Sequence, residues 1–461
     1  ALVTSTMSLV FDNTRFGGLL HADFLTMLRQ LQLGERLIAE NIRRYGLGAF
    51  RGTLRYCCDA SAETMRSAME LLPDGVYEGE DRLDADGAGD DEELVVRARV
   101  TKSCGRIEVD LSGSSRQART CINAGPLDAK TAVGAALKIL FDRNTPFTSG
   151  VFRHVDVVVP PGTVLSALPP DGAIMLYWEV TQTLLSAIVE ALAPALADRA
   201  VGGEYGAMSA HNAHGVRADG TPWANIAYCG GEHGPGGADR DHDGDSYTLT
   251  SLVNAMDPPT ETMEQESPVM LMRKEFVIDT GGPGQNRGGA AVVKDSFWRD
   301  TAHHYSMPLR LKRPTGFGVQ GAGFGRTGGA WFFPPEAVPG DGLLSFAGET
   351  YRAATPIAGV LDPETKELDP SGRYFYFARQ SIWHTRAGAG ARYITNGGGG
   401  WGHPLDRPPE RVLADVRNGY VSVASARDAY AVAIEGDPEH DPEGLRLDHA
   451  ATVALRAERR R

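Results

Sequence analysis

The most informative stretch of the sequence is Asp279-Thr280-Gly281-Gly282-Pro283-Gly284-Gln285-Asn286-Arg287-Gly288-Gly289, a glycine-rich loop after a predicted strand at Lys274–Ile278. Arg287 is the only fixed cation of this loop. Exposed backbone N–H groups beside a guanidinium form a receptor for a carboxylate or a phosphate. We therefore predict that Asp279 and Arg287 are catalytic and that the loop glycines bind substrate. These glycines are Gly281, Gly282, Gly284, Gly288 and Gly289. The alternative is an Asp279–Arg287 pair that only makes the turn rigid.

A second glycine cluster, Asn396–Pro404, has five glycines in the six positions 397–402. Glycine loses more conformational entropy on folding than any other residue. We therefore expect another strand or a partner chain to approach this backbone closely. The whole chain shows the same excess, with 55 glycines among 461 residues against about 7% in average proteins.

Short apolar runs alternate with glycine clusters between residues 202 and 407. This pattern predicts many short strands in a β-sandwich or barrel-like arrangement. The runs are Ala224–Tyr228, Tyr247–Val253, Arg273–Ile278, Ala330–Phe333, Tyr374–Phe377 and Arg392–Ile394.

The first 201 residues predict alternating helices and strands. Apolar residues at spacings of three, four and seven predict a helix over Asp23–Tyr45, which Gly46 ends. Further helices are predicted from Ser61, as N-cap, to Leu72, from Pro126 to Leu140, and from Trp178 to Leu196; the predicted strands are Leu94–Val100, Ile107–Leu111 and Val155–Val159. Two helices, Pro409–Arg417 and Ser422–Tyr430, are predicted near the end of the chain. The predicted fold is α+β, with a mixed region 1–201, a β-rich region 202–407 and a helical segment 408–461.

Composition excludes several classes of function. The 46 basic and 59 acidic residues give a net charge of −13, which is a poor match for nucleic acid or anionic lipid. No apolar run approaches the roughly 18 residues of a membrane span. The odd number of cysteines, two of them adjacent, predicts free thiols and a cytoplasmic protein. The cysteines are Cys57, Cys58, Cys104, Cys121 and Cys229.

The segment Asp239–Asp245 has the D-x-D-x-D-G spacing of calcium-binding loops. It predicts Asp239, Asp241 and Asp243 as ligands of a divalent cation. The alternative is a solvated acidic turn, because Thr250 stands where a calcium loop needs a glutamate.

Other metal and nucleotide motifs are weaker. His211 and His214 would share a metal only on a helix, and the glycines around them argue against one. His303-His304 is expected at the surface. The sequence has no G-K-[ST] phosphate loop and no G-x-S-x-G, and its two G-x-G-x-x-G segments, Gly316–Gly321 and Gly323–Gly328, open no predicted helix.

Several segments, in order along nearly the whole chain, resemble one known family. They are Val109–Gly113, Ile122-Asn123, Pro160–Thr163, Pro259–Glu261 with Glu264 and Pro268, Asp279–Gly289, Gly397–Gly402 and Asp415–Ser422. The sequence is identified by them as a member of the hydantoinase B/oxoprolinase family, the B-type subunits of N-methylhydantoinase, 5-oxoprolinase and acetone or acetophenone carboxylases. His403 departs from the family, which usually has an acidic residue there.

The resemblance implies a B-type subunit of an ATP-dependent cyclic-amide hydrolase. ATP would be bound by a separate A-type subunit and would activate the carbonyl of a hydantoin- or 5-oxoproline-like substrate. The alternatives are a subunit of an ATP-dependent ketone carboxylase and a scaffold without catalytic activity. Family members also carry an N-terminal segment whose histidines and aspartates bind the catalytic metal, and no residue here matches it. We expect a fragment or a further subunit that supplies this segment, so that most metal ligands lie outside this chain.

Overall fold

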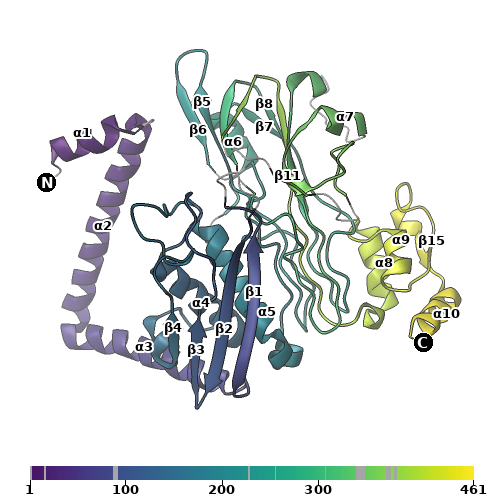
Figure 1. Ribbon diagram of the computed structural model, residues 1–461, viewed down its shortest axis with the longest axis horizontal. Coiled ribbons are helices and arrows are strands. Elements are labelled where there is room, and N and C mark those ends of the chain that lie inside the picture. Colours follow the sequence, from purple (N-terminus) through teal and green to yellow (C-terminus); the bar gives the residue numbers. More distant parts are fainter. Residues whose placement is uncertain are drawn as a thin grey trace. The chain divides into compact units, whose positions relative to one another are not determined.

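The structure is a computed structural model that describes residues 3–14, 17–86, 92–226, 229–254, 256–306, 308–338, 348–369, 375–377 and 382–460. The chain forms two compact units. The smaller comprises Ala1–Thr64 and Asn144–Arg153, and the larger comprises Met65–Arg143 and His154–Arg461. The predicted α+β class is confirmed (Figure 1). The domain boundaries after residues 201 and 407 both lie inside the larger unit and stay predictions.

The smaller unit is helical. It contains α1 (Thr4–Asp12), α2 (Gly17–Tyr45), α3 (Leu47–Met69) as far as Thr64, and most of the 3-10 helix η1 (Ser149–His154). The predicted helix over Asp23–Tyr45 is confirmed, although it begins earlier, at Gly17. It ends where predicted because Gly46 has a φ of +83°, a left-handed conformation that glycine adopts without steric cost.

The predicted start of the next helix is wrong. Ser61 is not an N-cap but lies inside α3, which begins at Leu47 directly after Gly46. Its side chain is buried, and Oγ donates to the carbonyl oxygen of Pro146 at 3.5 Å. Because the Ser61 hydroxyl bonds to a residue far away in the sequence, it does not cap a helix.

A four-stranded sheet begins the larger unit. Its order is β1 (Gly75–Leu83), β2 (Leu94–Ser103), β3 (Arg106–Asp110) and β4 (Val155–Val158), with only β3 and β4 parallel. Three of these strands were predicted. The fourth, β1, was not, because its charged sequence shows little apolar alternation and it is defined mainly by pairing along β2.

Two helices, α4 (Pro126–Phe141) and α5 (Tyr177–Leu196), pack together, and α5 lies against β1 and β2 (Figure 1). Both were predicted to within one residue at each end. The expectation that no apolar stretch reaches the length of a membrane span is wrong. Among the described residues, Tyr177–Arg199 is the one helical stretch long and apolar enough to cross a membrane, with a mean hydropathy of 1.5. Because 78% of that window is buried in the protein, α5 serves as a core helix.

Two antiparallel sheets form a sandwich in the second half of the chain. The six-stranded sheet has the order β12 (Phe375–Phe377), β11 (Thr355–Val360), β10 (Gly329–Phe333), β14 (Gly390–Ile394), β8 (Val292–Trp298) and β7 (Val269–Phe276). The four-stranded sheet has the order β13 (Ile382–Thr385), β9 (Ala302–Ser306), β5 (His211–Val216) and β6 (Pro222–Asn225). Short helices α6 (Thr260–Glu266) and α7 (Gly348–Ala353) lie between strands in the sequence.

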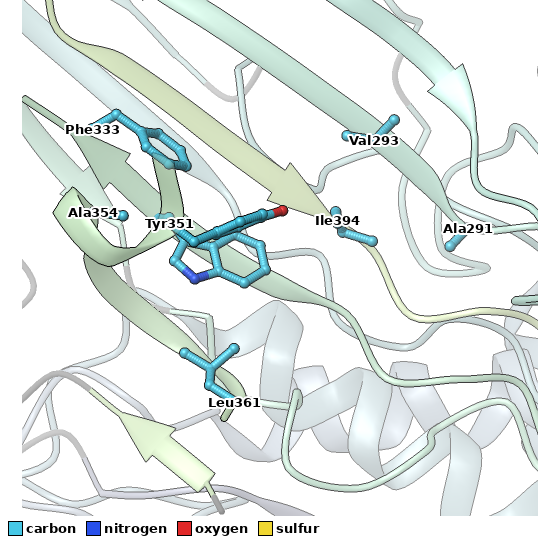
Figure 2. Close-up of a cluster of buried hydrophobic side chains, with 8 residues drawn as sticks. Ala291, Val293, Phe333, Tyr351, Ala354, Leu361 and Ile394 are labelled. Atoms are coloured by element: carbon cyan, nitrogen blue, oxygen red, sulfur yellow. The ribbon is translucent and has the colours of Figure 1, made fainter. Parts of the chain in front are cut away.

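β10 is buried on both faces. Phe332 belongs to the core between the sheets, with Trp383 of the smaller sheet at a ring distance of 5.5 Å. Phe333 points to the other face, where it lies beside Tyr351 of α7 in a cluster that also contains Ile394 (Figure 2). The alternation of a strand thus divides its side chains between two cores.

Five of the six strands predicted between residues 202 and 407 overlap observed strands, and one does not. Those at Arg273–Ile278, Ala330–Phe333 and Arg392–Ile394 correspond to β7, β10 and β14. The predictions at Ala224–Tyr228 and Tyr374–Phe377 overlap β6 and β12, and their residues 227, 228 and 374 lie outside the described ranges. The prediction at Tyr247–Val253 is wrong, because this segment forms only one bridge, between Thr248 and Gly234.

The glycine-rich segments pack against one another as extended backbone beside the sandwich. Gly202 N donates to Ala238 O at 2.8 Å, Ala238 N to Gly399 O at 2.9 Å, and Gly399 N to Gly203 O at 2.8 Å. Figure 1 shows them as long traces that run side by side. A Cβ on Gly399 would lie 1.9 Å from the carbonyl oxygen of Phe317. The close approach expected at Asn396–Pro404 is therefore made by other extended segments of the same chain, which are not regular strands.

The C-terminal segment has a small core of its own. It comprises α8 (Pro409–Arg417), α9 (Val423–Asp428), the β15–β16 pair (Ile434–Glu435 and Arg446–Leu447) and α10 (His449–Arg459). The first two are the predicted helices, and Ser422 caps α9 by accepting from Ser425 N. Val412, Tyr430 and Leu445 are among the residues of its buried cluster.

Candidate functional site

The side chain of Arg287 is buried in the loop that follows β7. Its Nε donates to Asp415 Oδ1 and an Nη to the carbonyl oxygen of Gly288, both at 3.1 Å. Its guanidinium carbon lies 3.9 Å from the centre of the Tyr420 ring. These contacts favour the structural alternative, although the acid is Asp415 of α8 and not Asp279. The catalytic role of Arg287 stays a prediction.

Asp279 also contacts the C-terminal segment. Its N–H donates to the carbonyl oxygen of Tyr420 at 3.0 Å, and its Oδ1 accepts from the N–H of Ser422 at 2.8 Å. Its φ of +60° lies in the left-handed region, where aspartate is one of the better tolerated residues. Asp279 and Arg287 therefore hold the same segment, residues 415–422, but do not pair with each other. The catalytic role of Asp279 also stays a prediction.

The glycines of this loop are packed against backbone and do not form an open receptor. The N–H groups of Gly282, Gly288 and Gly289 donate to carbonyl oxygens at 2.8–3.1 Å. A Cβ on Gly281 or Gly284 would lie 2.3 or 2.5 Å from a backbone oxygen. The expectation that backbone N–H groups of this loop are exposed is therefore wrong, because most of them donate to carbonyl oxygens of the same chain. Substrate binding by these glycines stays a prediction.

The carboxylates of the acidic loop have separate partners. Asp239 Oδ1 accepts from the N–H groups of Asp241 and His242, each at 2.9 Å, which closes a turn. Asp241 is exposed, 3.3 Å from Arg240 Nε. Asp243 instead lies between Arg407 and Arg411, with N–O distances of 2.8–2.9 Å.

Within the described ranges, no three His, Cys, Asp or Glu side chains are placed to hold a metal ion. These contacts favour the alternative of an acidic turn, in which arginines pair with Asp243. Cation binding by Asp239, Asp241 and Asp243 stays a prediction. Because Arg407 also contacts Asp415 at 2.7 Å, a buried ion network joins this loop, the glycine loop and α8.

Two of the histidines, His211 and His304, are buried in the sandwich. His211 and His214 lie on β5 three residues apart, and therefore face opposite sides of the strand. The expected surface position is confirmed for His303, which is exposed, and is wrong for His304, which is buried with its Nδ1 2.9 Å from His211 Nε2. Burial lowers the pKa of His211 to about 4, so the ring is neutral at pH 7.

A cavity of about 540 Å³ lies between the α4–α5 pair and the glycine-rich segments. Leu185 and Val189 of α5, together with Phe317, give it an apolar side. The backbone of residues 202–204 and 236–239 and the segment 248–253 give it a polar side. A cavity of this size with one apolar and one polar side can hold a small molecule.

Glu204 is one of two acidic residues that line this cavity. Its carboxylate accepts from Ser251 Oγ at 2.8 Å and from Ser251 N at 3.1 Å. Burial raises the pKa of Glu204 to about 7, although these hydrogen bonds oppose the shift. A carboxyl with such a pKa can both donate and accept a proton at neutral pH.

Arg143 and Asp239 also line the cavity, and Arg143 Nη1 lies 3.5 Å from Asp239 Oδ2. The Arg143 side chain is half exposed. A guanidinium in this position can bind a carboxylate or phosphate group of a ligand. Asp239, predicted as a metal ligand, is thus placed beside the cavity.

Two further polar side chains of α5 are buried without complete hydrogen bonding. Glu179 Oε2 and both polar atoms of the Gln182 side chain have no partner among the described residues. Burial raises the pKa of Glu179 to about 7, so a large part of this carboxyl is protonated at pH 7. Glu179 and Glu204 are both close enough to Arg310 for its charge to lower their pKa values.

Glu204, Glu179 and Arg143 were not predicted from the sequence. The segment Gly202-Gly203-Glu204-Tyr205-Gly206 contains the one available signal, an acid among glycines directly after a buried helix. Neither its burial nor its neighbour Ser251, 47 residues later, is visible in a local pattern.

Several known proteins are similar to this chain in sequence and in fold. The beta subunit of a caprolactamase from Pseudomonas jessenii is 28% identical over 459 residues, which cover 98% of this chain and 71% of that protein. A protein assigned to a D-/L-hydantoinase of Pseudomonas sp. (strain NS671) as its B-type subunit is 26% identical, covering 94% and 68%. The acetophenone carboxylase delta subunit of Aromatoleum aromaticum is 25% identical, covering 91% and 61%.

The crystal structure of the ATP-dependent caprolactamase from Pseudomonas jessenii has the same fold, with a TM-score of 0.79 at 24% identity over 98% of this chain and 72% of that one. A family model, hydantoinase B/oxoprolinase, matches residues 2–404. With more than four fifths of its length matched, the chain belongs to the hydantoinase B/oxoprolinase family.

Proposed function

We propose that this protein is the B-type subunit of an ATP-dependent cyclic-amide hydrolase that opens hydantoin- or 5-oxoproline-like rings with an A-type subunit. Family membership supports an enzyme subunit, and the relatives include subunits of a caprolactamase and a hydantoinase. The observation that carries the proposal is the cavity with Glu204 in it. Its apolar side suits ring methylene groups, and its polar side suits an amide.

Glu204 would act as the acid–base group of ring opening. Hydrolysis of an amide needs a proton on the leaving nitrogen, and a water molecule must lose one when it attacks the carbonyl carbon. A carboxyl with a pKa of about 7 suits either transfer, and Ser251 fixes its orientation. Arg143 would bind an anionic group of the activated substrate at the same cavity.

ATP would supply the activation, because an unstrained amide is a poor electrophile. We place its site on the A-type subunit. Of the two G-x-G-x-x-G segments, the second leads into β10 and not into a helix. Backbone N–H groups of both segments already donate to carbonyl oxygens of the packed glycine-rich segments, for example Gly325 N to Gly316 O at 2.8 Å. The described residues offer no group of metal ligands, so we derive no step through a metal.

The proposal is tested with the chain reconstituted with its A-type partner, ATP and a hydantoin, 5-oxoproline or lactam. Ring opening should require both ATP and the partner. Glu204→Gln keeps the size and acceptor of the side chain but removes its proton transfer, so kcat should fall at least about 100-fold. The inflection near pH 7 in the kcat/KM profile should disappear.

Glu190→Gln is the matched control, since Glu190 lies on α5 outside the cavity and should leave kcat unchanged. Unchanged turnover of Glu204→Gln would remove the cavity from the mechanism. Ring opening without ATP, or ATP hydrolysis by this chain alone, would contradict the division of labour between the two polypeptides.

The alternative is a subunit of a ketone carboxylase, which the likeness to the acetophenone carboxylase delta subunit favours. Bicarbonate-dependent consumption of acetone or acetophenone would establish it. A chain that assembles with its partner but whose Glu204→Gln variant leaves every activity of the complex unchanged would instead indicate the scaffold alternative. We place the protein in the cytoplasm, consistent with its five free cysteines.

A further inference from the structure

The long helix α2, seen in Figure 1, carries a stripe of exposed apolar side chains. Phe24, Leu31, Ile38 and Tyr45 are spaced by seven residues, at position a of a heptad repeat. Leu20 and Met27 occupy the d positions between them. All six side chains are exposed, Leu31 by 73% and Ile38 by 50%.

The stripe is long enough for a coiled coil. It covers almost four heptads of a 29-residue helix, which rises about 44 Å at 1.5 Å per residue. Within the smaller unit, α1 covers only its beginning, through the ring of Phe11, 5.8 Å from that of Phe24. Exposed apolar surface of this extent marks an interaction site.

We propose that α2 pairs with α2 of a second copy of this chain, in antiparallel orientation. The d positions decide the orientation, because the last two are Gly34 and Asn41. In a parallel pair each would face itself and leave the centre of the interface poorly filled. In an antiparallel pair each d residue faces a large a residue, so that Leu31 packs over Gly34 of the second copy. The other layers are Phe24 with Asn41, Ile38 with Met27, and Tyr45 with Leu20.

The charges beside the stripe agree with this register. Asp23 and Arg44 occupy the first and last g positions of the repeat. Antiparallel pairing brings Asp23 of one copy next to Arg44 of the other, and the twofold axis makes this contact twice. Arg29, Arg36 and Arg43 lie at position f, on the opposite side of the helix, where they stay in water. The stripe is thus complementary to itself in shape and in charge.

The test measures the oligomeric state of the full chain, without other subunits, by sedimentation velocity over a range of concentrations. The wild-type chain should form a dimer. Leu31→Glu places a charge in the central layer twice, and it should raise the dimer dissociation constant about 100-fold or more. Gln32→Glu, the adjacent residue outside the stripe, is the matched control and should leave the constant unchanged. Because Leu31 is exposed in the single chain, circular dichroism should show unchanged helix content in both variants.

A charge exchange tests the orientation. Asp23→Arg and Arg44→Asp should each weaken the dimer two- to tenfold, and the double variant should restore it, as expected for a pair of exposed ion pairs. A wild-type chain that stays monomeric would overturn the proposal, as would a dimer insensitive to Leu31→Glu. A double variant weaker than either single variant would overturn the antiparallel register. If the wild-type chain is monomeric and Leu31→Glu instead abolishes binding of a different polypeptide, the proposed pairing between copies is wrong and the stripe binds that polypeptide.

Discussion

Asp415 accepts hydrogen bonds from two buried arginines, Arg287 and Arg407, and thereby links α8 to the glycine-rich loop after β7. A buried charge is tolerated when its partners satisfy it, and removing one partner leaves it uncompensated. The family motif around Arg287 and the motif around Asp415 lie 128 residues apart in the sequence and meet here. Arg287 therefore binds the loop after β7 to α8 through Asp415.

Arg287→Ala should lower the free energy of unfolding by about 3 kcal/mol, because Asp415 loses one guanidinium and Tyr420 loses its cation. Denaturant unfolding measures this change. Arg287→Lys keeps the charge and should cost less. The catalytic prediction is tested in the same variants: lower turnover in a folded, assembled Arg287→Lys enzyme would support it, and unchanged turnover would remove Arg287 from the mechanism.

At the scale of elements, the glycine layers are the least usual feature of the fold. These layers are the packed glycine-rich segments, which include residues 202–204, 236–239, 281–289 and 397–402. Their backbones lie too close together for a Cβ atom between them, and backbone hydrogen bonds join them. The cavity with Glu204 uses two of these segments, residues 202–204 and 236–239, as its polar side. The layers therefore hold the candidate site rigidly, while α5 supplies the apolar side.

Gly399→Ala should destabilise the protein by about 3 kcal/mol or more, since its Cβ would lie 1.9 Å from the carbonyl oxygen of Phe317 and backbone cannot move aside. Thermal and denaturant unfolding would show the change. Gly52→Ala is the matched control. Gly52 lies inside α3, where an added Cβ would have nothing within 4 Å, so alanine should stabilise this helix by up to about 1 kcal/mol. Equal effects of both substitutions would contradict the packing account.

At the scale of the whole molecule, several buried carboxyls hold their protons to unusually high pH. Burial raises the pKa of Asp84 to about 8 and those of Glu179 and Glu204 to about 7. In the unfolded chain these groups titrate near pH 4. The folded state therefore binds more protons between about pH 4.5 and 8, and its stability falls as the pH rises through this range.

Asp84→Asn removes the titration of that group but leaves an acceptor for the N–H groups of Leu311 and Lys312. The variant should be close to wild type at pH 5 and more stable at pH 8, by on the order of 2 kcal/mol. Denaturant unfolding at several pH values checks this. Asp110→Asn is the control, because hydrogen bonds from Ser112 lower the pKa of Asp110 and its effect belongs below pH 5. Parallel stability curves for wild type and Asp84→Asn would contradict the prediction.

Local pattern alone determined the class of fold, the helices α2, α4, α5 and α8, and strands such as β10 and β14, because apolar periodicity and glycine or proline at the ends are properties of neighbouring residues. Family motifs determined the kind of enzyme subunit. Only the tertiary structure decided what Arg287, Asp279 and the acidic loop contact, that Tyr247–Val253 is not a strand, and that Glu204 lies in a cavity. The reason is physical: burial, a shifted pKa and the pairing of charges depend on residues far away in the sequence, and no local pattern contains them.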